Sequence, residues 1–378
     1  MIHFVTHEFA PFRGGIATYV RETAGAASRL GYPVRVIAPD YGLDNHPGDA
    51  AENFPVERVR CSGRLTPVGI WSLARALAVR RETMREARIV VLSPGALMAM
   101  MIARGLGWIS TSGPVVAFFH GSEVLRFRRH PLWRRLSACF LPHTKPACAS
   151  QFVEVLIHES DLVPRNIPIV RAPCACPADV VQSAADIFDI TPTRTTGYDP
   201  FTLLTLARLH PRKGQHLTAR ALGLLPPELK QRIHYVIAGE GAPAYRDEVE
   251  RACVEAGIRH TFRDVASPAE LTSIYATCDA FIMTSVRLPN SVEGFGISYL
   301  EASVHGKPVI AFRTGGVEEA VLQDQTGLLV AEGDLSGVAV AVQRLMLEPD
   351  LRERLGRGGR EFALGLSWDN AARALCEG

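Results

Sequence analysis

The segment SVEGFGISYLEASVHGKPVIAFRTGG, residues 291–316, decides the fold class because helical and strand patterns meet in it. We expect a helix to begin near Gly294 or Phe295 and an apolar strand to cover residues 308–312. Glu293 stands in front of that helix, and Glu301 lies about two turns inside it. A strand that is apolar throughout and adjoins a helix is typical of a parallel sheet covered on both faces.

The same alternation runs along the whole chain and predicts an α/β protein with two Rossmann-like domains facing each other across a cleft. We expect an N-terminal domain over 1–172, a proline-rich linker over 173–200, and a C-terminal domain over 201–363. A terminal helix is expected at about 364–378. The predicted strands are 2–6, 34–38, 88–92, 115–119, 146–150 and 167–171, then 201–207, 234–239, 260–264, 280–284, 308–312 and 327–330.

Composition narrows the class of protein. The 378 residues are 47% hydrophobic and 21% charged, as in globular proteins. No apolar run reaches the roughly 18 residues that span a bilayer, and the N-terminus lacks a signal-peptide pattern. The eight cysteines lack disulfide or zinc spacing, so we expect reduced thiols and a cytoplasmic protein. Residues 1–172 hold 21 Lys and Arg against 13 Asp and Glu, a net charge of +8.

The predicted helix start in the opening segment is a candidate nucleotide-sugar site. The first turn of a helix leaves backbone N–H groups unpaired, and Gly294, Phe295 and Gly296 would let a phosphate approach them. Glu293 and Glu301 would then accept hydrogen bonds from the hydroxyls of a sugar and a ribose on either side. The alternative is that both glutamates belong to an ordinary solvated helix face.

Two more strand ends in the second half carry candidate residues. In TLARLHPRKGQHL, residues 205–217, Arg208 and Lys213 would stabilise the charge of a departing diphosphate. An ordinary basic surface loop is the alternative, although Lys213 is one of only four lysines. Gly239 and Gly241, in VIAGEGAPAY, would let the backbone reach the donor, or they support a tight turn.

The first half offers two weaker candidates. Gly14 and Gly15 lie between the first strand and the first helix, where glycine-rich turns let the backbone reach phosphate or sugar. His120 follows the fourth predicted strand and is a candidate sugar contact. A plain turn and a structural histidine are the alternatives.

Together, EGFGISYLE, RLHPRKG, GEG, TGGVEEAVLQDQTGLLV and FRGGIATYV resemble the retaining glycosyltransferases of family 4, which have the GT-B fold. The resemblance covers most of the chain and is densest over 201–332. It implies transfer of a hexosyl group from a UDP- or GDP-sugar to a hydroxyl, with retained configuration. It also implies that the terminal helix crosses back onto the first domain.

The resemblance assigns roles to the candidates. Glu293 would contact hydroxyls of the donor sugar and Glu301 those of the ribose, while Arg208 and Lys213 would clamp the diphosphate. His120 would lie near the transferred sugar, and Gly15 near the phosphates. Because the sequence contains no Asp-x-Asp motif, no metal or other cofactor is expected.

The acceptor should dock on the first domain. Residues 123–140 combine five arginines with three aromatic residues, which suits a lipid-linked acceptor or the inner face of a membrane. A solvated basic helix pair is the alternative, and no nucleic-acid-binding motif accompanies the segment. A nucleotide-sugar epimerase, a sugar phosphorylase with a lysine-bound cofactor and a non-catalytic sugar-nucleotide binding protein are the rival functions.

Overall fold

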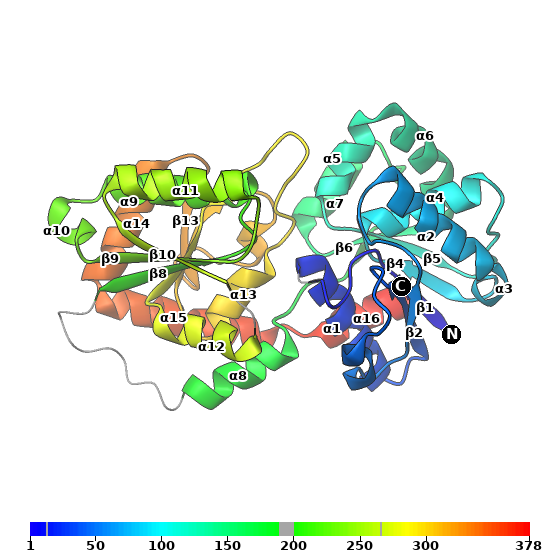
Figure 1. Cartoon of the computed structure of the whole chain (residues 1–378), viewed down its shortest axis with the longest axis horizontal. Coiled ribbons are helices and arrows are strands. Elements are labelled where there is room, and N and C mark those ends of the chain that lie inside the picture. Colours follow the sequence, from blue (N-terminus) through cyan, green and yellow to red (C-terminus); the bar gives the residue numbers. More distant parts are fainter. Residues whose placement is uncertain (13, 189–199, 265–266) are drawn as a thin grey trace. The chain divides into compact units, whose positions relative to one another are not determined.

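The computed structural model describes residues 1–12, 14–188, 200–264 and 267–378. Each of its two compact units is built on one parallel sheet (Figure 1). Unit 1 comprises Met1–Cys174, Pro289–Gly294 and Ser367–Gly378, and unit 2 comprises Ala175–Leu288 and Phe295–Leu366. Two doubly wound α/β units confirm the predicted fold class. Within the described residues, no helix is both long and apolar enough to cross a bilayer.

Unit 1 has a seven-stranded sheet in the order β3-β2-β1-β4-β5-β6-β7, with every pair parallel. The sequence predicted six strands and missed β3, an edge strand whose VERV sequence has two adjacent charged residues between its valines and is mostly half-exposed. The strands are β1 (Ile2–Val5), β2 (Val34–Pro39), β3 (Val56–Val59), β4 (Arg88–Val91), β5 (Val115–Phe119), β6 (Lys145–Cys148) and β7 (Val170–Arg171).

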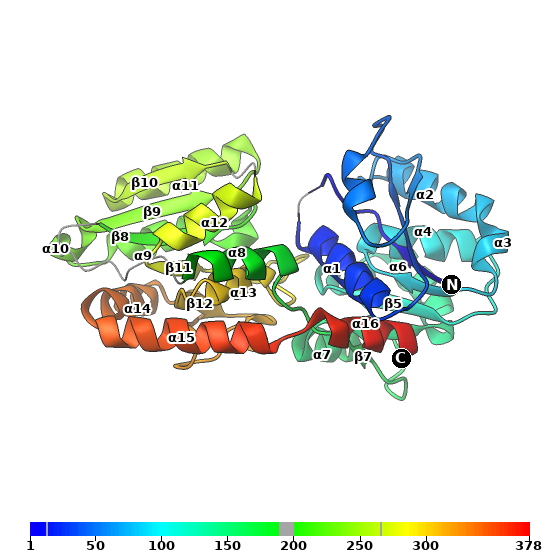
Figure 2. The same cartoon turned by 90° about the horizontal axis from the view of Figure 1, so that it is seen from below.

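Helices cover both faces of this sheet. One face packs against α2, α4, α5, α6 and α7 in a continuous apolar core, while α1 and α16 lie together on the other face (Figures 1 and 2). The bounds are α1 (Gly15–Arg29), η1 (Pro47–Ala51), α2 (Pro67–Val79), α3 (Arg81–Met84), α4 (Pro94–Gly105), α5 (Ser122–Arg129), α6 (Pro131–Phe140), η2 (Leu141–His143), α7 (Gln151–Glu159) and α16 (Trp368–Glu377).

The C-terminal helix α16 belongs to unit 1 although the sequence before it belongs to unit 2. Trp368 contacts Tyr19 of α1 edge-to-face, with ring centroids 5.3 Å apart. The carbonyl of Gly378 accepts hydrogen bonds from Lys145 and Arg88, both at 2.9 Å. Apolar packing and these charged donors hold the chain end on unit 1.

Unit 2 has a six-stranded parallel sheet in the order β10-β9-β8-β11-β12-β13. The order reverses between β8 and β11, the position where ligands bind in open α/β sheets. The strands are β8 (Phe201–Leu206), β9 (Ile233–Ala238), β10 (Arg259–Arg263), β11 (Ala280–Met283), β12 (Val309–Arg313) and β13 (Gly327–Ala331).

In unit 2, α9, α11 and α14 cover one face of the sheet, and α12, α13 and α15 the other (Figure 1). The bounds are α8 (Ala178–Phe188), η3 (Pro211–Lys213), α9 (Gln215–Gly223), α10 (Pro227–Lys230), α11 (Pro243–Ala256), α12 (Pro268–Thr277), α13 (Ile297–Val304), η4 (Val317–Glu319), α14 (Leu335–Leu347) and α15 (Pro349–Gly365).

The segment predicted as a linker, 173–200, contains helix α8. This helix packs against α12 and α13 and is therefore an integral part of unit 2. Val180 and Ala184, four residues apart, are its buried apolar positions. Residues 189–199 of the predicted linker lie outside the described residues.

Candidate active site

The loop after β8 carries Arg208 and Lys213, the two predicted diphosphate-binding residues. Lys213 ends η3, and Gly214 follows it with a φ of 70°. A Cβ on Gly214 would lie 1.9 Å from the carbonyl oxygen of Thr284, so only glycine fits there. The Thr284 hydroxyl donates to the Gly214 carbonyl at 2.8 Å. These contacts fix Lys213 where the neighbouring strands β8 and β11 end.

His210 shows that positive charge accumulates in this loop. Its Nδ1 accepts a hydrogen bond from the backbone N–H of Arg212 at 3.1 Å and so caps η3. Burial lowers the pKa of His210, and the charges of Arg212, Arg208 and Lys213 lower it further. A neutral imidazole within electrostatic reach of three cations describes an electropositive strand end, suited to an anion.

Gly239 and Gly241 pack against this loop from β9. A Cβ on Gly239 would lie 2.3 Å from the carbonyl oxygen of Ala207, and one on Gly241 would lie 2.2 Å from that of Leu209. The side chain of Gln215, which is fully buried, donates to the carbonyl of Arg208 at 3.1 Å. The two glycines therefore let the backbone on both sides of Arg208 be held closely.

Glu301, on α13, lies in the same unit. The hydroxyl of Tyr275 donates a hydrogen bond to its Oε2 at 2.9 Å. Burial raises the pKa of Glu301 to about 7, although the Tyr275 hydrogen bond opposes the rise. The charge of Asp179 raises this pKa as well, and that of Lys213 lowers it. The structure thus brings the predicted ribose-binding carboxylate within electrostatic reach of a predicted diphosphate-binding cation.

The residues around the predicted helix start are divided between the two units. Phe295 and Gly296 belong to unit 2, whereas Glu293 and Gly294 belong to unit 1. The helix begins at Ile297, slightly later than predicted, because Gly296 has a φ of 100° that helical residues do not adopt. The two glutamates, eight positions apart in sequence, therefore belong to different structural units.

Within unit 1, the segment Pro289–Gly294 is bound to the ends of β5 and β6. The backbone N–H of Val292 donates to the Ser122 hydroxyl at 3.1 Å, and the Ser150 hydroxyl donates to the Gly294 carbonyl at 2.6 Å. A Cβ on Gly294 would lie 2.0 Å from the carbonyl oxygen of His120. Glu293, 8% exposed, lies between these anchored neighbours. Ser122 and Ser150 could not be predicted as site residues from the sequence, because hydroxyls at helix starts are common caps.

His120, the predicted sugar contact, follows β5 in unit 1. Its Nε2 lies 2.8 Å from the carbonyl oxygen of Leu92, and because a carbonyl only accepts, this nitrogen carries the proton. Its ring packs edge-to-face on Phe118, with centroids 4.8 Å apart. Burial lowers the pKa of His120, while the Glu123 carboxylate opposes that shift. The neutral ring therefore keeps its lone pair on Nδ1.

Two buried polar groups near His120 were not predicted as site residues. Glu123, 1% exposed, accepts a hydrogen bond from the His120 backbone through Oε1, whereas its Oε2 has no partner among the described residues. His7 follows β1, and burial, together with the electrostatic influence of His120 and Arg126, lowers its pKa to about 4. Its ring lies over Gly95, where a Cβ would come within 2.6 Å. No repeated spacing in the sequence links these residues.

Gly14 and Gly15, the predicted phosphate-loop glycines, stand at the start of α1. A Cβ on Gly14 would lie 3.1 Å from the Phe12 ring and 3.8 Å from Glu8 Oε2, whereas one on Gly15 would meet no atom within 4 Å. The space beside Gly15 is therefore open. Among the residues that the structure describes, no three His, Cys, Asp or Glu side chains are grouped to hold a metal ion.

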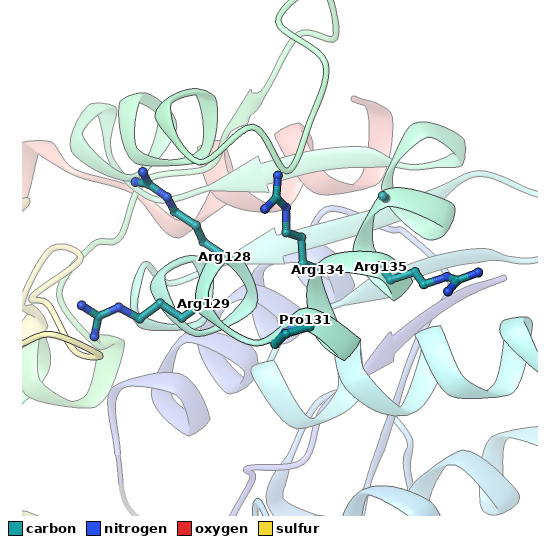
Figure 3. A pocket seen from close by; sticks show the side chains of 6 residues that line it. Arg128, Arg129, Pro131, Arg134 and Arg135 are labelled. Carbon is teal, nitrogen blue, oxygen red and sulfur yellow. The ribbon is translucent and has the colours of Figure 1, made fainter.

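The basic segment 123–140 forms α5 and α6 in unit 1. Between these helices lies a hollow of about 370 Å³ lined by Arg128, Arg129, Pro131, Arg134, Arg135 and Ala138. Figure 3 shows Arg128 and Arg134 extending to the same side, while Arg129 and Arg135 extend in opposite directions. Arg129 donates to the Asn290 side chain at 2.9 Å.

Comparison with known proteins identifies the class. The family model "Glycosyl transferases group 1" matches residues 192–362, and "Glycosyltransferase Family 4" matches residues 13–166. Sucrose-phosphate synthase from Thermosynechococcus elongatus superposes with a TM-score of 0.77 at 19% identity, over 98% of this chain and 96% of that one. The molecule is a glycosyltransferase with the GT-B fold.

Sequence relatives agree with this class. A GDP-mannose-dependent α-(1-6)-phosphatidylinositol monomannoside mannosyltransferase from Mycolicibacterium smegmatis is 29% identical, over 99% of this chain and 96% of its own. A D-inositol 3-phosphate glycosyltransferase from Corynebacterium jeikeium is 32% identical over 62% of this chain and 59% of its own. The chain belongs to the family 4 glycosyltransferases, as the sequence motifs predicted.

Proposed function

We propose that this enzyme transfers a hexosyl group from a nucleotide-diphosphate sugar to a hydroxyl of an anionic, lipid-linked acceptor, with retention of configuration. The observation that carries the proposal is that, within unit 2, the half-buried carboxylate of Glu301 lies within electrostatic reach of Lys213 in the cationic loop. The hydroxyls of a ribose would bind to the carboxylate, and a diphosphate would bind to the cationic loop. GDP-mannose is the first donor to test, because the mannosyltransferase relative is named for it, and UDP-sugars are the second.

The proposed chemistry rests on the leaving group. The bond between the sugar C1 and the phosphate oxygen breaks, and Arg208 and Lys213 stabilise the charge that develops on the diphosphate. The acceptor oxygen forms the new bond to C1, and its proton passes to the departing phosphate oxygen. No protein nucleophile and no metal ion are required in this scheme, because cations and positioning supply the stabilisation.

The remaining candidates position the donor. Glu301 accepts hydrogen bonds from the ribose hydroxyls, and Glu293 from hydroxyls of the transferred sugar. The Nδ1 lone pair of His120 accepts a hydrogen bond from another hydroxyl of the sugar, since the Nε2 proton is donated to the Leu92 carbonyl. The open space at Gly15 admits a phosphate oxygen close to the start of α1.

The acceptor side of the proposal rests on α5 and α6. Two guanidinium groups extending to the same side of a hollow suit a phosphate-bearing headgroup at an anionic membrane surface. Leu132, which lies between Arg128 and Arg134 in the sequence and is 54% exposed, adds an apolar contact. We place the enzyme in the cytoplasm, at the inner face of the membrane, because nucleotide-sugar donors are cytoplasmic metabolites.

Membrane binding is tested by co-sedimentation with phosphatidylglycerol-containing and purely phosphatidylcholine vesicles at low and high salt. The Arg128→Gln/Arg134→Gln variant should lose binding to anionic vesicles, whereas Arg85→Gln/Arg165→Gln, with the same charge change at exposed sites elsewhere in unit 1, should retain most of it. Equal losses in both variants would reduce the effect to net charge, and no binding to anionic vesicles at low salt would end the membrane proposal.

The reaction is tested in two stages. Thermal-shift measurements with GDP-, UDP- and ADP-sugars identify the donor, and product analysis with mannose- and inositol-phosphate lipids then identifies the acceptor. Proton NMR of the product gives its anomeric configuration. Conversion of the donor sugar without any acceptor would instead indicate an epimerase. Donor binding with no turnover on any acceptor would favour the non-catalytic alternative.

A further inference from the structure

Tyr275 is a fully buried residue of unit 2 that takes no part in the chemistry proposed above. It lies on α12, and its ring stacks on that of His305 with centroids 4.8 Å apart and an angle of 20° between the planes. A buried phenol needs a hydrogen-bond partner. Its hydroxyl has Glu301 Oε2 at 2.9 Å and the more distant Ser298 carbonyl at 3.4 Å, both on α13.

His305 binds Glu301 through the Glu301 backbone carbonyl. Its Nδ1 lies 2.7 Å from the backbone carbonyl of Glu301 and must donate the hydrogen bond, because a carbonyl only accepts. Burial lowers the pKa of His305 to about 4, so the ring is neutral at physiological pH. Tyr275 thus contacts Glu301 through its hydroxyl and contacts, through its ring, the histidine that binds the Glu301 backbone.

We propose that Tyr275 is a positioning residue for the nucleotide: its hydroxyl holds Oε2 of Glu301 so that Oε1 faces the ribose hydroxyls. The inference rests on the proposed role of Glu301 in ribose binding. Among the residues that the structure describes, Tyr275 is the only side chain that donates a hydrogen bond to Glu301, so no other donor of this kind orients the carboxylate.

The same hydrogen bond keeps the carboxylate in the form that binds a ribose. An ionised carboxylate can accept hydrogen bonds from ribose hydroxyls at both lone-pair regions of Oε1. Protonation of the carboxylate weakens these hydrogen bonds. Burial favours the protonated form, and Asp179 on α8 adds to it, whereas the Tyr275 hydroxyl and Lys213 on η3 favour the ionised form. Removing the hydroxyl should therefore raise the pKa of Glu301.

The test uses Tyr275→Phe, which retains the ring on His305 and removes only the hydroxyl. Binding of GDP, UDP and their 2′,3′-dideoxy forms is measured by calorimetry from pH 5.5 to 9. In the unchanged enzyme the ribonucleotide should bind about tenfold more tightly than the dideoxy form at pH 8, as expected for hydrogen bonds to a charged group. In Tyr275→Phe that preference should fall to about threefold or less, and the pH at which it is half lost should move upward.

Tyr235→Phe is the matched control. Tyr235 is also fully buried in unit 2, but its hydroxyl bonds to Thr205 at 2.8 Å. Its removal should leave the ribose preference and its pH midpoint unchanged. In a Glu301→Gln background, Tyr275→Phe should have no further effect on the preference, because the oriented carboxylate is already absent.

The outcomes separate the inference from the function on which it rests. If the unchanged enzyme bound ribo and dideoxy nucleotides equally, the assignment of Glu301 to the ribose would fail. If it preferred the ribonucleotide and Tyr275→Phe kept both the full preference and the pH midpoint, only the role of Tyr275 would be overturned. Should Tyr275→Phe not fold, 3-fluorotyrosine at position 275 replaces it: the more acidic hydroxyl should lower the midpoint, and an unchanged midpoint would overturn the inference.

Discussion

Replacing Glu301 by glutamine should stabilise unit 2 while it weakens donor binding. Burial raises the pKa of Glu301 from 4.5 to about 7. Between these values the folded protein binds more protons at this site than the unfolded chain does, so the free energy of unfolding falls as the pH rises. Glutamine is nearly isosteric, still accepts the Tyr275 hydrogen bond through its oxygen, and carries no charge to bury.

The magnitude follows from the same shift. A difference of about 2.5 pKa units corresponds to roughly 3 kcal/mol for the fully ionised carboxylate, and partial solvent access reduces this to about 2 kcal/mol. At pH 8 the whole penalty is present in the unchanged enzyme, whereas at pH 5 Glu301 is protonated in the folded state and little penalty remains. Glu301→Gln should therefore raise the free energy of unfolding by about 2 kcal/mol more at pH 8 than at pH 5.

Urea denaturation at the two pH values measures this difference, followed by circular dichroism and analysed for the transition of unit 2. Glu353→Gln, at an exposed carboxylate of α15, is the control and should change stability equally little at both values. Calorimetric titration with the nucleotide should show Glu301→Gln binding at least tenfold more weakly at pH 8. An equal stability change at pH 5 and pH 8 would refute the reasoning that desolvation raises the pKa of Glu301, even if binding were lost.

Three further predictions concern the other site residues. Lys213→Ala and Glu293→Ala should each lower turnover at least about a hundredfold in a steady-state assay with saturating donor, since each removes one stabilising contact, and near-unchanged rates in both would remove these roles. Gly214→Ala should destabilise the enzyme by at least about 2 kcal/mol in urea denaturation, because its Cβ meets the Thr284 carbonyl, whereas Gly257→Ala, with a φ of 65° and no atom within 4 Å, should cost about 1 kcal/mol. Treatment with EDTA should leave at least half of the activity; a tenfold loss restored by Mg²⁺ would contradict a metal-free diphosphate site.

The fold could be predicted from the sequence because strands buried on both faces read as continuous apolar runs. β5, with the sequence VVAFF, is buried at every position, and so is β11, AFIM. The edge strand β3 was not predicted because it is mostly half-exposed and two of its four residues are charged. Helix α8 was hidden by the prolines and threonines around it, which suggested a linker, although Val180 and Ala184 give it a buried face.

The site could be predicted only where residues adjoin in sequence. Arg208, Lys213 and Glu301 could be chosen as candidates because strand ends and helix starts mark the ligand-binding edge of a parallel sheet. Tyr275 was not found, because a tyrosine within SIYATCDAFI has the pattern of a core residue, and its contact with Glu301 spans 26 positions. A buried hydroxyl shows its partner only once the helices are packed.

Two glycines of the segment 291–316, Gly294 and Gly296, are constrained by the packing and conformation of the backbone, whereas the sequence motif suggested that they admit a ligand. Gly294 was expected to let a ligand approach the backbone, yet the atom that comes closest to its missing Cβ is the carbonyl oxygen of His120, at 2.0 Å. Because that contact joins two backbone segments of unit 1, a larger residue at 294 would displace Glu293 and the end of β5 together. Gly296 is required for its φ of 100°, which turns the chain into α13 and so sets the position of Glu301 within that helix. Each glutamate is therefore positioned within its own unit before any ligand is bound, Glu293 by the backbone packing at Gly294 and Glu301 by the backbone conformation at Gly296.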